Sequence, residues 1–320
     1  MRKSYLSYLK TKLYWEPSFI LKYYLHKKNC IERDEYIFMA DGKMIHGGLF
    51  DRLKGAISIY ALSKVHGKPF GLYFTDPFCL EKYLEPNQYD WKKSENDLNY
   101  AYPYSRPVIA YSELHYPKRL MKAREGQIHF YFGGDILENI NKKYKRNFDW
   151  AVLFNELFVP SRSLASYIEK IKENIGCRYI AIHIRFLNLL GDKNENKTYK
   201  ALDQKGRDLL IQTCINKIKE LTVSYNSNHI VPVLCSDSKA FLGFLKNELP
   251  NVFIIKGTPC HIDKISELSE DDALKLFADM YILAGAQKVY SIVGCGLYKS
   301  AFPQYSAKIG RTKFERISLL

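Results

Sequence analysis

Two side chains that suit phosphate chemistry stand close together at the end of one apolar segment. His183 and Arg185 lie two residues apart in segment 178–186 (RYIAIHIRF), which is typical of a strand. Side chains two apart on a strand point to the same face, so both would lie at its carboxyl end. An arginine guanidinium can donate two charge-assisted hydrogen bonds to a phosphate. The structural alternative is an ion-paired Arg185 beside a packed His183.

A glycine pair lies where another expected strand meets a helix. Gly47 and Gly48 follow the apolar segment 35–40 and precede helical spacing over 49–65. Glycines permit close backbone approach, and the N–H groups that begin a helix can bind an anion. Arg52, in the first turn, is unfavourable beside the helix dipole unless an anion or acid compensates it. A flexible turn without a ligand is the alternative.

Polar or glycine residues also follow two later strands. Asp237 comes after segment 230–235, where its carboxylate could accept hydrogen bonds from a nucleotide or cap the next helix. A glycine-rich turn follows segment 288–293 and could cradle a phosphate or let a helix pack closely on the sheet. The candidate residues of this turn are Gly294, Cys295, Gly296, Tyr298 and Lys299.

The elements that would position these residues alternate between strands and helices. In the second half the expected strands are 178–186, 230–235, 252–256 and 288–293, with helices between them. This order predicts an α/β fold with a parallel sheet, whose ligands bind outside the carboxyl ends of the strands. A length of 320 residues favours two domains. We expect an N-terminal domain over 1–160, a C-terminal domain over 161–305 and a tail over 306–320.

The composition narrows the class of protein. Lys and Arg number 48 against 34 Asp and Glu, a net charge of +14 that attracts phosphate groups, unless it only reflects a genome-wide lysine bias. Lys and Tyr are spread along the chain and no nucleic-acid-binding module stands out, so nucleic acid is not the expected partner. No apolar stretch reaches the roughly 18 residues of a membrane span. The seven scattered cysteines fit a reduced, cytoplasmic protein.

The first 29 residues combine basic and aromatic side chains. Seven of them are Lys or Arg, and Trp15 and Phe19 are interleaved among leucines and tyrosines. This pattern is typical of a helix lying on an anionic lipid surface, which would make the protein peripheral on the inner face of a membrane. An ordinary amphipathic helix packed on its domain is the favoured alternative, because Pro17 interrupts the pattern.

A resident metal ion is not expected. Cys260, His261 and Asp263 are of metal-ligating types, but they lack the four ligands and the spacing of a known zinc site. The chain has no Asp-x-Asp sequence, the pattern with which many enzymes hold a nucleotide sugar through Mg²⁺ or Mn²⁺. Phosphate binding by arginine, lysine and backbone groups is therefore favoured.

The order of four short motifs resembles the superfamily of GDP-fucose-dependent fucosyltransferases. That superfamily includes the α1,2- and α1,6-fucosyltransferases, the nodulation fucosyltransferase and the protein O-fucosyltransferases. The match spans roughly residues 40–302. The motifs are Gly47-Gly48-Leu49-Phe50-Asp51-Arg52, Phe154-Asn155-Glu156-Leu157-Phe158, His183-Ile184-Arg185, and Asp279-Met280-Tyr281 leading into Val293-Gly294-Cys295-Gly296-Leu297-Tyr298-Lys299.

The resemblance implies a GT-B-like fold, with two Rossmann-like domains facing a cleft, and an inverting transfer of fucose that needs no metal. The acceptor would be a glycan, with a polypeptide as the weaker choice. Separately, the lack of a signal sequence or membrane span suggests a bacterial enzyme of surface polysaccharide synthesis. By position, Arg185 resembles the arginine that holds the β-phosphate of GDP-fucose. His183 and Asp279 resemble its neighbours on the nucleotide, Asp237 the carboxylate that binds base or ribose, and 294–299 the phosphate loop.

Two features of the sequence leave alternatives open. His46 is the preferred general base because of its loop position and pKa class, with Asp51 and Glu156 as rivals. Cys295 and Tyr298 stand where the superfamily usually has serines. A transferase that uses another nucleotide sugar, or an inactive transferase-like binding protein, therefore stays an alternative to a fucosyltransferase.

Overall fold

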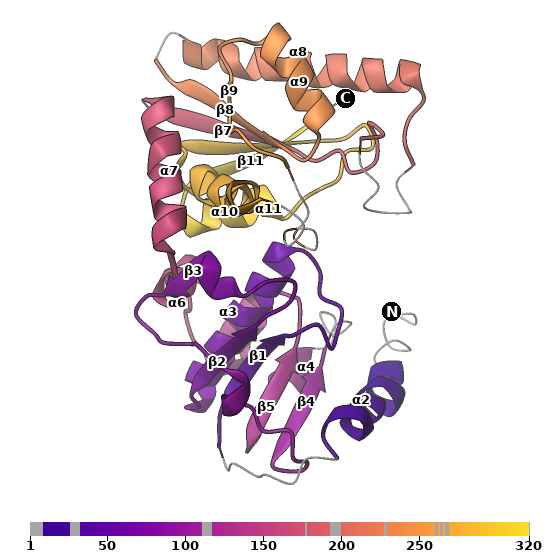
Figure 1. Ribbon diagram of the computed structural model, residues 1–320, viewed down its shortest axis with the longest axis vertical. Coiled ribbons are helices and arrows are strands. Elements are labelled where there is room, and N and C mark those ends of the chain that lie inside the picture. The colour runs from indigo at the N-terminus through magenta and orange to yellow at the C-terminus, as the bar shows by residue number, and fades with distance from the viewer. Residues whose placement is uncertain are drawn as a thin grey trace. The chain divides into compact units, whose positions relative to one another are not determined.

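The computed structural model divides the chain into two units, Met1–Val159 and Pro160–Leu320 (Figure 1). It describes residues 9–25, 33–110, 117–176, 178–192, 200–226, 229–259, 262, 265 and 269–319. In both units the larger sheet is wholly parallel, which confirms the expected α/β class. No helix of the described residues is long and apolar enough to cross a membrane.

Unit 1 is built on a four-stranded sheet in the order β2-β1-β5-β4. Its strands are β1 (Tyr36–Ala40), β2 (Phe70–Phe74), β4 (Ser105–Ile109) and β5 (Gln127–Tyr131), and a separate two-stranded sheet pairs β3 (Leu84–Pro86) with β6 (Phe158–Pro160). The helical segments are η1 (Thr11–Trp15), α2 (Glu16–Tyr23), α3 (Leu49–His66), η2 (Leu80–Lys82), η3 (Glu95–Asp97), α4 (Pro117–Leu120), α5 (Leu137–Tyr144) and α6 (Trp150–Leu157).

Helices cover both faces of the unit 1 sheet. The side chains of Ile37 and Met39 pack with Phe19 and Tyr24 near α2. On the other face, Gly55 of α3 lies so close to Phe38 and to the Phe132 backbone that an added Cβ would clash with both. Helix α3 matches the expected helix and ends at Gly67, whose φ of 64° a glycine adopts without strain.

Unit 2 is built on a five-stranded sheet in the order β11-β10-β7-β8-β9. The strands are β7 (Tyr179–Ile184), β8 (Val231–Ser236), β9 (Phe253–Ile254), β10 (Lys288–Val293) and β11 (Lys313–Ser318). The helices are α7 (Arg162–Ile175), α8 (Gln204–Asn226), α9 (Lys239–Glu248), α10 (Glu270–Gly285) and α11 (Phe302–Ile309). Figure 1 shows α8 and α9 on one face of this sheet and α7, α10 and α11 on the other.

The expected tail over 306–320 is wrong. Residues 306–309 finish α11, and residues 313–318 form β11, which pairs in parallel register with the whole of β10. The sequence KFERIS mixes charged and apolar side chains, and this strand is a partly exposed edge of the sheet rather than a buried run. The other expected strands of unit 2 are present, although β9 is shorter than expected, with two residues.

Candidate functional site

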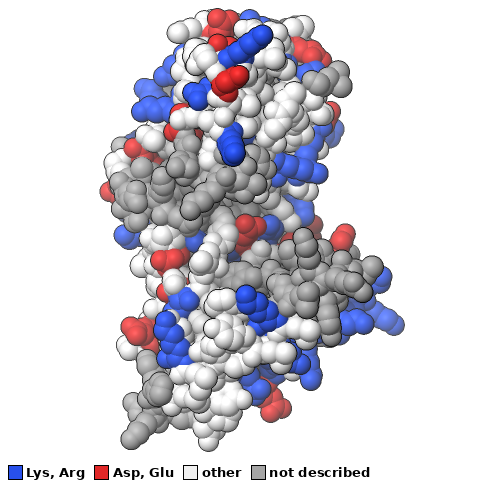
Figure 2. Space-filling model, turned by 90° about the vertical axis from the view of Figure 1, so that its right-hand side faces the viewer, with Lys and Arg blue, Asp and Glu red and all other residues white. Residues whose placement is uncertain are grey.

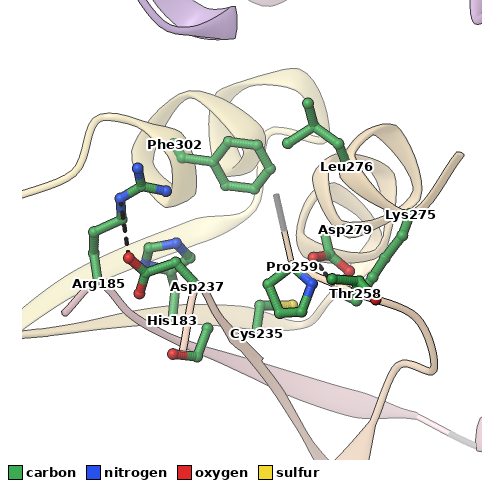
Figure 3. Close-up of a pocket in the computed structure, with 11 residues that line it drawn as sticks. His183, Arg185, Cys235, Asp237, Thr258, Pro259, Lys275, Leu276, Asp279 and Phe302 are labelled. Atoms are coloured by element: carbon green, nitrogen blue, oxygen red, sulfur yellow. Dashed lines mark hydrogen bonds and ion pairs between the residues drawn. The ribbon is translucent and has the colours of Figure 1, made fainter. Parts of the chain in front are cut away.

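A pocket opens at the carboxyl edge of the unit 2 sheet, where ligands of parallel sheets bind (Figure 3). Its walls come from the ends of β7 and β8, the loop after β9, and the helices α10 and α11. It contains about 410 Å³ of empty space that is partly open to solvent. The lining residues are His183, Arg185, Cys235, Ser236, Asp237, Thr258, Pro259, Lys275, Leu276, Asp279 and Phe302. Four residues singled out from the sequence, His183, Arg185, Asp237 and Asp279, thus meet in one pocket.

The carboxylate of Asp237 holds the turn that follows β7. Its Oδ1 accepts a hydrogen bond from the backbone N–H of Phe186 (2.8 Å), and its Oδ2 accepts one from Leu187 (2.9 Å). Oδ2 also lies 3.5 Å from Nε of Arg185, the ion pair drawn as a dashed line in Figure 3. Asp237 therefore fixes both the backbone after β7 and the stem of the Arg185 guanidinium.

Asp237 does not cap the helix after β8, which was one of its two expected roles. The N-cap of α9 is Ser238, whose Oγ accepts a hydrogen bond from the N–H of Phe241 (3.1 Å). A second carboxylate supports this helix start, because Asp192 accepts hydrogen bonds from Oγ of Ser238 (2.7 Å) and from the N–H of Ala240 (3.1 Å). The capping work at this helix start is thus done by Ser238 and Asp192.

A buried ion pair on α10 faces the same pocket. Nζ of Lys275 lies 2.6 Å from Oδ2 of Asp279, one helical turn away, while Oδ1 of Asp279 is buried without a hydrogen-bond partner. Burial raises the pKa of the Asp279 carboxyl, and the ammonium of Lys275 offsets only part of this. Burial lowers the pKa of Lys275, but the charge of Asp279 more than offsets it, so this pKa is raised. The pair gives the pocket a buried cation and an acceptor with spare capacity.

The sequence analysis missed Lys275. A lysine on a helix is usually a solvated residue, and nothing about its type distinguishes it from the other lysines of the chain. The usable signal was position: Lys275 stands four residues before Asp279, with Ala273, Leu274 and Phe277 on the buried side of the same helix. A lone lysine among buried apolar positions needs a carboxylate partner, and the i, i+4 spacing supplies one.

His183 is a neutral imidazole on the floor of the pocket. Its ring is stacked against that of Phe302, with centroids 5.8 Å apart and planes at 28°. Burial, together with the smaller effect of the positive charges of Arg185 and Lys275, lowers the pKa of His183 to about 3. Its Nδ1 is buried without a hydrogen-bond partner. At neutral pH this ring can therefore donate or accept one hydrogen bond within the pocket.

The glycine-rich turn after β10 contacts the pocket only indirectly. The N–H of Tyr298 donates a hydrogen bond to the carbonyl of Arg185 (3.0 Å), yet no residue of the turn lines the pocket described above. Gly294 has a φ of 98°, and a Cβ there would lie 2.7 Å from the Leu319 carbonyl oxygen. Packing against the chain after β11 therefore accounts for this glycine, while the turn's role as a phosphate loop stays a prediction.

The glycine pair of unit 1 lies, as expected, between a strand and a helix. Gly48 is the N-cap of α3, and a Cβ on Gly47 would lie 2.3 Å from a carboxylate oxygen of Asp51. The Arg52 guanidinium is buried, with its carbon 5.6 Å from the centre of the Phe74 ring. A cation–π contact therefore contributes to stabilising this arginine at the helix start.

The three candidates for the general base also lie in unit 1. His46 is buried, with its ring 5.9 Å from that of Phe38 and 6.3 Å from that of Tyr131. Asp51 forms an ion pair with Lys54 (2.6 Å). Glu156 accepts hydrogen bonds from the Tyr60 hydroxyl and from Lys64, both at 2.6 Å. The two carboxylates are engaged with unit 1 partners, and the histidine is enclosed by aromatic rings.

A metal site is not evident in the part of the chain that the structure describes. No group of three or more His, Cys, Asp or Glu side chains among these residues is arranged to hold a metal ion. Cys260, His261 and Asp263 lie outside the described residues. The expectation of metal-free phosphate binding stays a prediction.

The fold and the position of the pocket define the class of protein: an α/β chain of the GT-B type, with two units built on parallel sheets. Solved structures that share this fold include fucosyltransferases. NodZ from Bradyrhizobium is 15% identical over 87% of this chain and 93% of its own, with a TM-score of 0.56. NodZ α-1,6-fucosyltransferase co-crystallised with GDP gives the same identity and TM-score, over 87% and 92% of the two chains.

A plant protein shares the fold over nearly the whole chain. A variant of Arabidopsis thaliana FUT1 in complex with GDP is 12% identical, covers 98% of this chain and 74% of its own, and gives a TM-score of 0.59. No protein-family model matches the sequence, and no curated protein matches it either. The structural similarity confirms the expected GT-B fold, which this chain shares with these fucosyltransferases.

Proposed function

We propose that this chain is an inverting glycosyltransferase that moves fucose from GDP-fucose to a glycan hydroxyl without a metal ion. The observation that carries the proposal is the unit 2 pocket, in which Arg185, Lys275 and a neutral His183 line one space at the carboxyl edge of the sheet. Fold neighbours crystallised with GDP support the choice of nucleotide. We assign the transfer to the synthesis of a bacterial surface polysaccharide.

In this proposal the pocket receives the GDP half of the donor. The Arg185 guanidinium binds the β-phosphate, and Oδ1 of Asp279 accepts an N–H of the base, since it is the acceptor with spare capacity. The neutral His183 supplies a further hydrogen bond through Nδ1. Asp237 is a positioning residue, because its oxygens already accept two backbone N–H groups and pair with Arg185.

The transfer forms one bond and breaks another. The acceptor oxygen bonds to the anomeric carbon of fucose as the bond from that carbon to the β-phosphate oxygen breaks, and the electron pair of the broken bond stays on GDP. Negative charge therefore grows on the phosphate, where Arg185 stabilises it. The acceptor's proton passes to a base, for which we propose His46. A normal turnover of His46→Ala at saturating donor would assign the base elsewhere, with Asp51 and Glu156 as the remaining candidates.

Calorimetric titration with GDP, UDP, CMP and ADP, each with and without EDTA, tests the nucleotide part of the proposal. We expect selective GDP binding that EDTA leaves unchanged. Lys275→Met should weaken GDP binding, whereas Arg162→Ala, an exposed arginine of unit 2 outside the pocket, should not. Preference for another nucleotide would replace the donor, and binding to none of the four would overturn the proposed site.

Turnover separates the enzyme from a transferase-like binding protein. Cys295 and Tyr298 are the departures from the superfamily pattern that motivate this second candidate, and both side chains are exposed on the turn after β10. Release of fucose or its transfer to a glycan from GDP-fucose supports the enzyme. Tight GDP binding without any turnover of GDP-fucose or GDP-mannose would favour the binding protein.

A further inference from the structure

The helical segment of residues 9–25 carries apolar side chains on its outer face. It consists of residues 9 and 10, η1, α2 and the two residues that follow, and it packs against the unit 1 sheet beside β4 (Figure 1). A helix that lies on the surface of a globular protein normally turns a polar face outward. The outer face of this segment departs from that rule, because Leu13, Tyr14, Trp15, Leu21 and Leu25 are all exposed on it.

The inner face of the segment packs against the core of unit 1 and forms polar contacts there. Phe19 and Tyr24 are buried in the core next to Ile37 and Met39, and the Tyr24 hydroxyl is hydrogen-bonded to Nδ1 of His129 (2.7 Å). The carboxylate of Glu16 forms an ion pair with Arg119. These contacts fix which face points outward, and among the described residues of unit 1 the side chains on that face stay exposed.

The outer face forms an apolar stripe. Leu13 lies in η1, Leu21 in α2, and Leu25 two residues beyond the end of α2, and all three side chains are exposed. Leu13 is 70% exposed, Leu21 58% and Leu25 49%. Tyr14 and Trp15 are exposed beside them, with ring centroids 5.4 Å apart. Leucines with adjacent Trp and Tyr are the side chains that insert at the boundary between lipid headgroups and acyl chains.

The rim of the stripe is basic. Lys10, Lys12 and Lys22 are all exposed, and the only acid of the segment is the paired Glu16. Two of the lysines extend along aromatic rings: Nζ of Lys10 is 5.7 Å from the Trp15 ring centre, and Nζ of Lys22 is 5.0 Å from that of Tyr23. Figure 2 views the molecule from the side on which α2 lies in Figure 1, and blue side chains predominate over red there in unit 1. An uncharged apolar partner would not need this rim.

We propose that residues 9–25 bind the surface of a bilayer that contains anionic lipid. The segment lies in the plane of the interface, with Leu13, Leu21 and Leu25 among the acyl chains and the lysines at the headgroups. Both attractions act together, because apolar burial supplies most of the free energy and each lysine adds to it through the negative surface potential. The chain thereby associates with a membrane without spanning it.

Vesicle sedimentation of the whole chain tests this inference. We expect binding to vesicles of phosphatidylcholine mixed with phosphatidylglycerol, and at least about tenfold weaker binding to phosphatidylcholine alone or in high salt. The double variant Leu13→Ser/Leu21→Ser should reduce the partition coefficient by about 100-fold or more, since two leucines no longer enter the lipid. The substituted side chains are exposed, so the thermal unfolding midpoint should stay unchanged.

A matched control shows whether vesicle binding depends on residues 9–25 or on any exposed apolar side chain. Leu209 and Val223 of α8 are each 68% exposed, and Leu209→Ser/Val223→Ser should leave vesicle binding as in the unmodified chain. Equal loss in both double variants would overturn the proposal, as would absence of binding to the anionic vesicles. Sedimentation velocity without lipid provides another check: a dimer that Leu13→Ser/Leu21→Ser dissociates would assign the stripe to a second copy of the chain instead. GDP binding, which resides in unit 2, should not differ between the variants.

Discussion

His129 in unit 1 and His183 in unit 2 are both buried, neutral histidines, and they differ in what surrounds their ring nitrogens. In unit 1, Nδ1 of His129 is hydrogen-bonded to the Tyr24 hydroxyl (2.7 Å) and Nε2 to Oε1 of Gln127 (2.8 Å). In unit 2, Nδ1 of His183 has no partner and the ring lines a pocket. Burial lowers the pKa of both side chains to about 3.

The two histidines differ in how many hydrogen bonds their ring nitrogens form and not in how deeply they are buried. His129 belongs to a chain of polar groups that continues through Gln127 to Glu35 and ends at Lys93, with each member hydrogen-bonded inside unit 1. Such a network stabilises one arrangement of the core and leaves nothing for a ligand. His183 and Asp279 each keep an unused polar atom beside an open space. Buried polar atoms without partners are costly, so their presence in a pocket indicates groups that a ligand completes.

The largest effect should come from the arginine of the unit 2 pocket. Arg185→Ala should lower the turnover of GDP-fucose by about 100-fold or more, because the phosphate loses its charge-assisted donor as negative charge develops. Arg185→Lys should retain part of the rate, since a charge remains but the planar fork is lost. Steady-state kinetics with Arg162→Ala as the control measures this. A rate for Arg185→Ala within a few-fold of the unmodified chain would mean that Arg185 has a structural role only, like the polar network around His129 in unit 1.

Asp237→Asn tests whether the pocket's carboxylate is structural. An amide keeps one acceptor oxygen but directs an NH₂ group at the second backbone N–H. The free energy of unfolding should fall by about 2 kcal/mol, and GDP binding should weaken because Arg185 loses its ion pair. Denaturant unfolding and calorimetry measure the two effects. Ser238→Ala removes the α9 cap and the hydrogen bond to Asp192 but not the bonds of Asp237, so it should cost about 1–2 kcal/mol and leave the GDP affinity intact. An unchanged free energy of unfolding in Asp237→Asn would mean that the Asp237 carboxylate contacts the ligand and does not hold the turn after β7.

Acidification should weaken both units. A histidine of the unfolded chain binds a proton below its usual pKa of 6.5, whereas the folded His183 stays neutral down to about 3. The stability is therefore fully present above pH 6.5 and is lost as the pH falls toward 3, by about 1.4 kcal/mol per pH unit for each such histidine. His183→Asn should flatten this dependence in unfolding experiments between pH 7 and pH 4. An unchanged slope would mean that the folded His183 is protonated at the same pH as in the unfolded chain.

Tyr24→Phe should give the smallest effect. It removes the hydroxyl that is bonded to Nδ1 of His129 and leaves the packing of the ring in place, so the free energy of unfolding should fall by about 1 kcal/mol. Tyr23→Phe is the matched control, because that ring packs on Phe19 and its hydroxyl is not part of the network. Equal stability of the two variants would show that the His129 network does not contribute to the stability of unit 1.

The sequence predicted the strands of unit 2 better than those of unit 1, for a physical reason. β7, β8 and β10 are nearly continuous apolar runs, as buried parallel strands are. β5 is equally buried but contains Gln127 and His129, whose partners come from distant parts of the chain. β4 contains Pro107, which is tolerated because β4 is an edge strand paired only with β5. Local patterns do not contain that information.

The candidate site was predicted in part. His183 and Arg185 were placed correctly because strand periodicity and sheet topology decide where a strand's end points. Asp237 lines the pocket as expected, but its hydrogen bonds to the turn after β7 depend on a loop conformation that residue type does not specify. Lys275 was missed because its burial follows from the packing of α10 and not from its own character.

The order of strands in each sheet has a consequence for how the chain reaches its native state. Central strand β1 pairs with β5 through Tyr36 and Ile128, and central strand β7 pairs with β10 through Ala181 and Val289. In neither case does a hairpin between neighbouring segments supply the pairing. The entropy of closing such long loops is lost before these contacts form, which slows folding relative to proteins with local contacts. During refolding, the strands of each sheet should therefore pair well after the helices have formed. In that interval, apolar strands such as β7 and β10 are exposed and can aggregate.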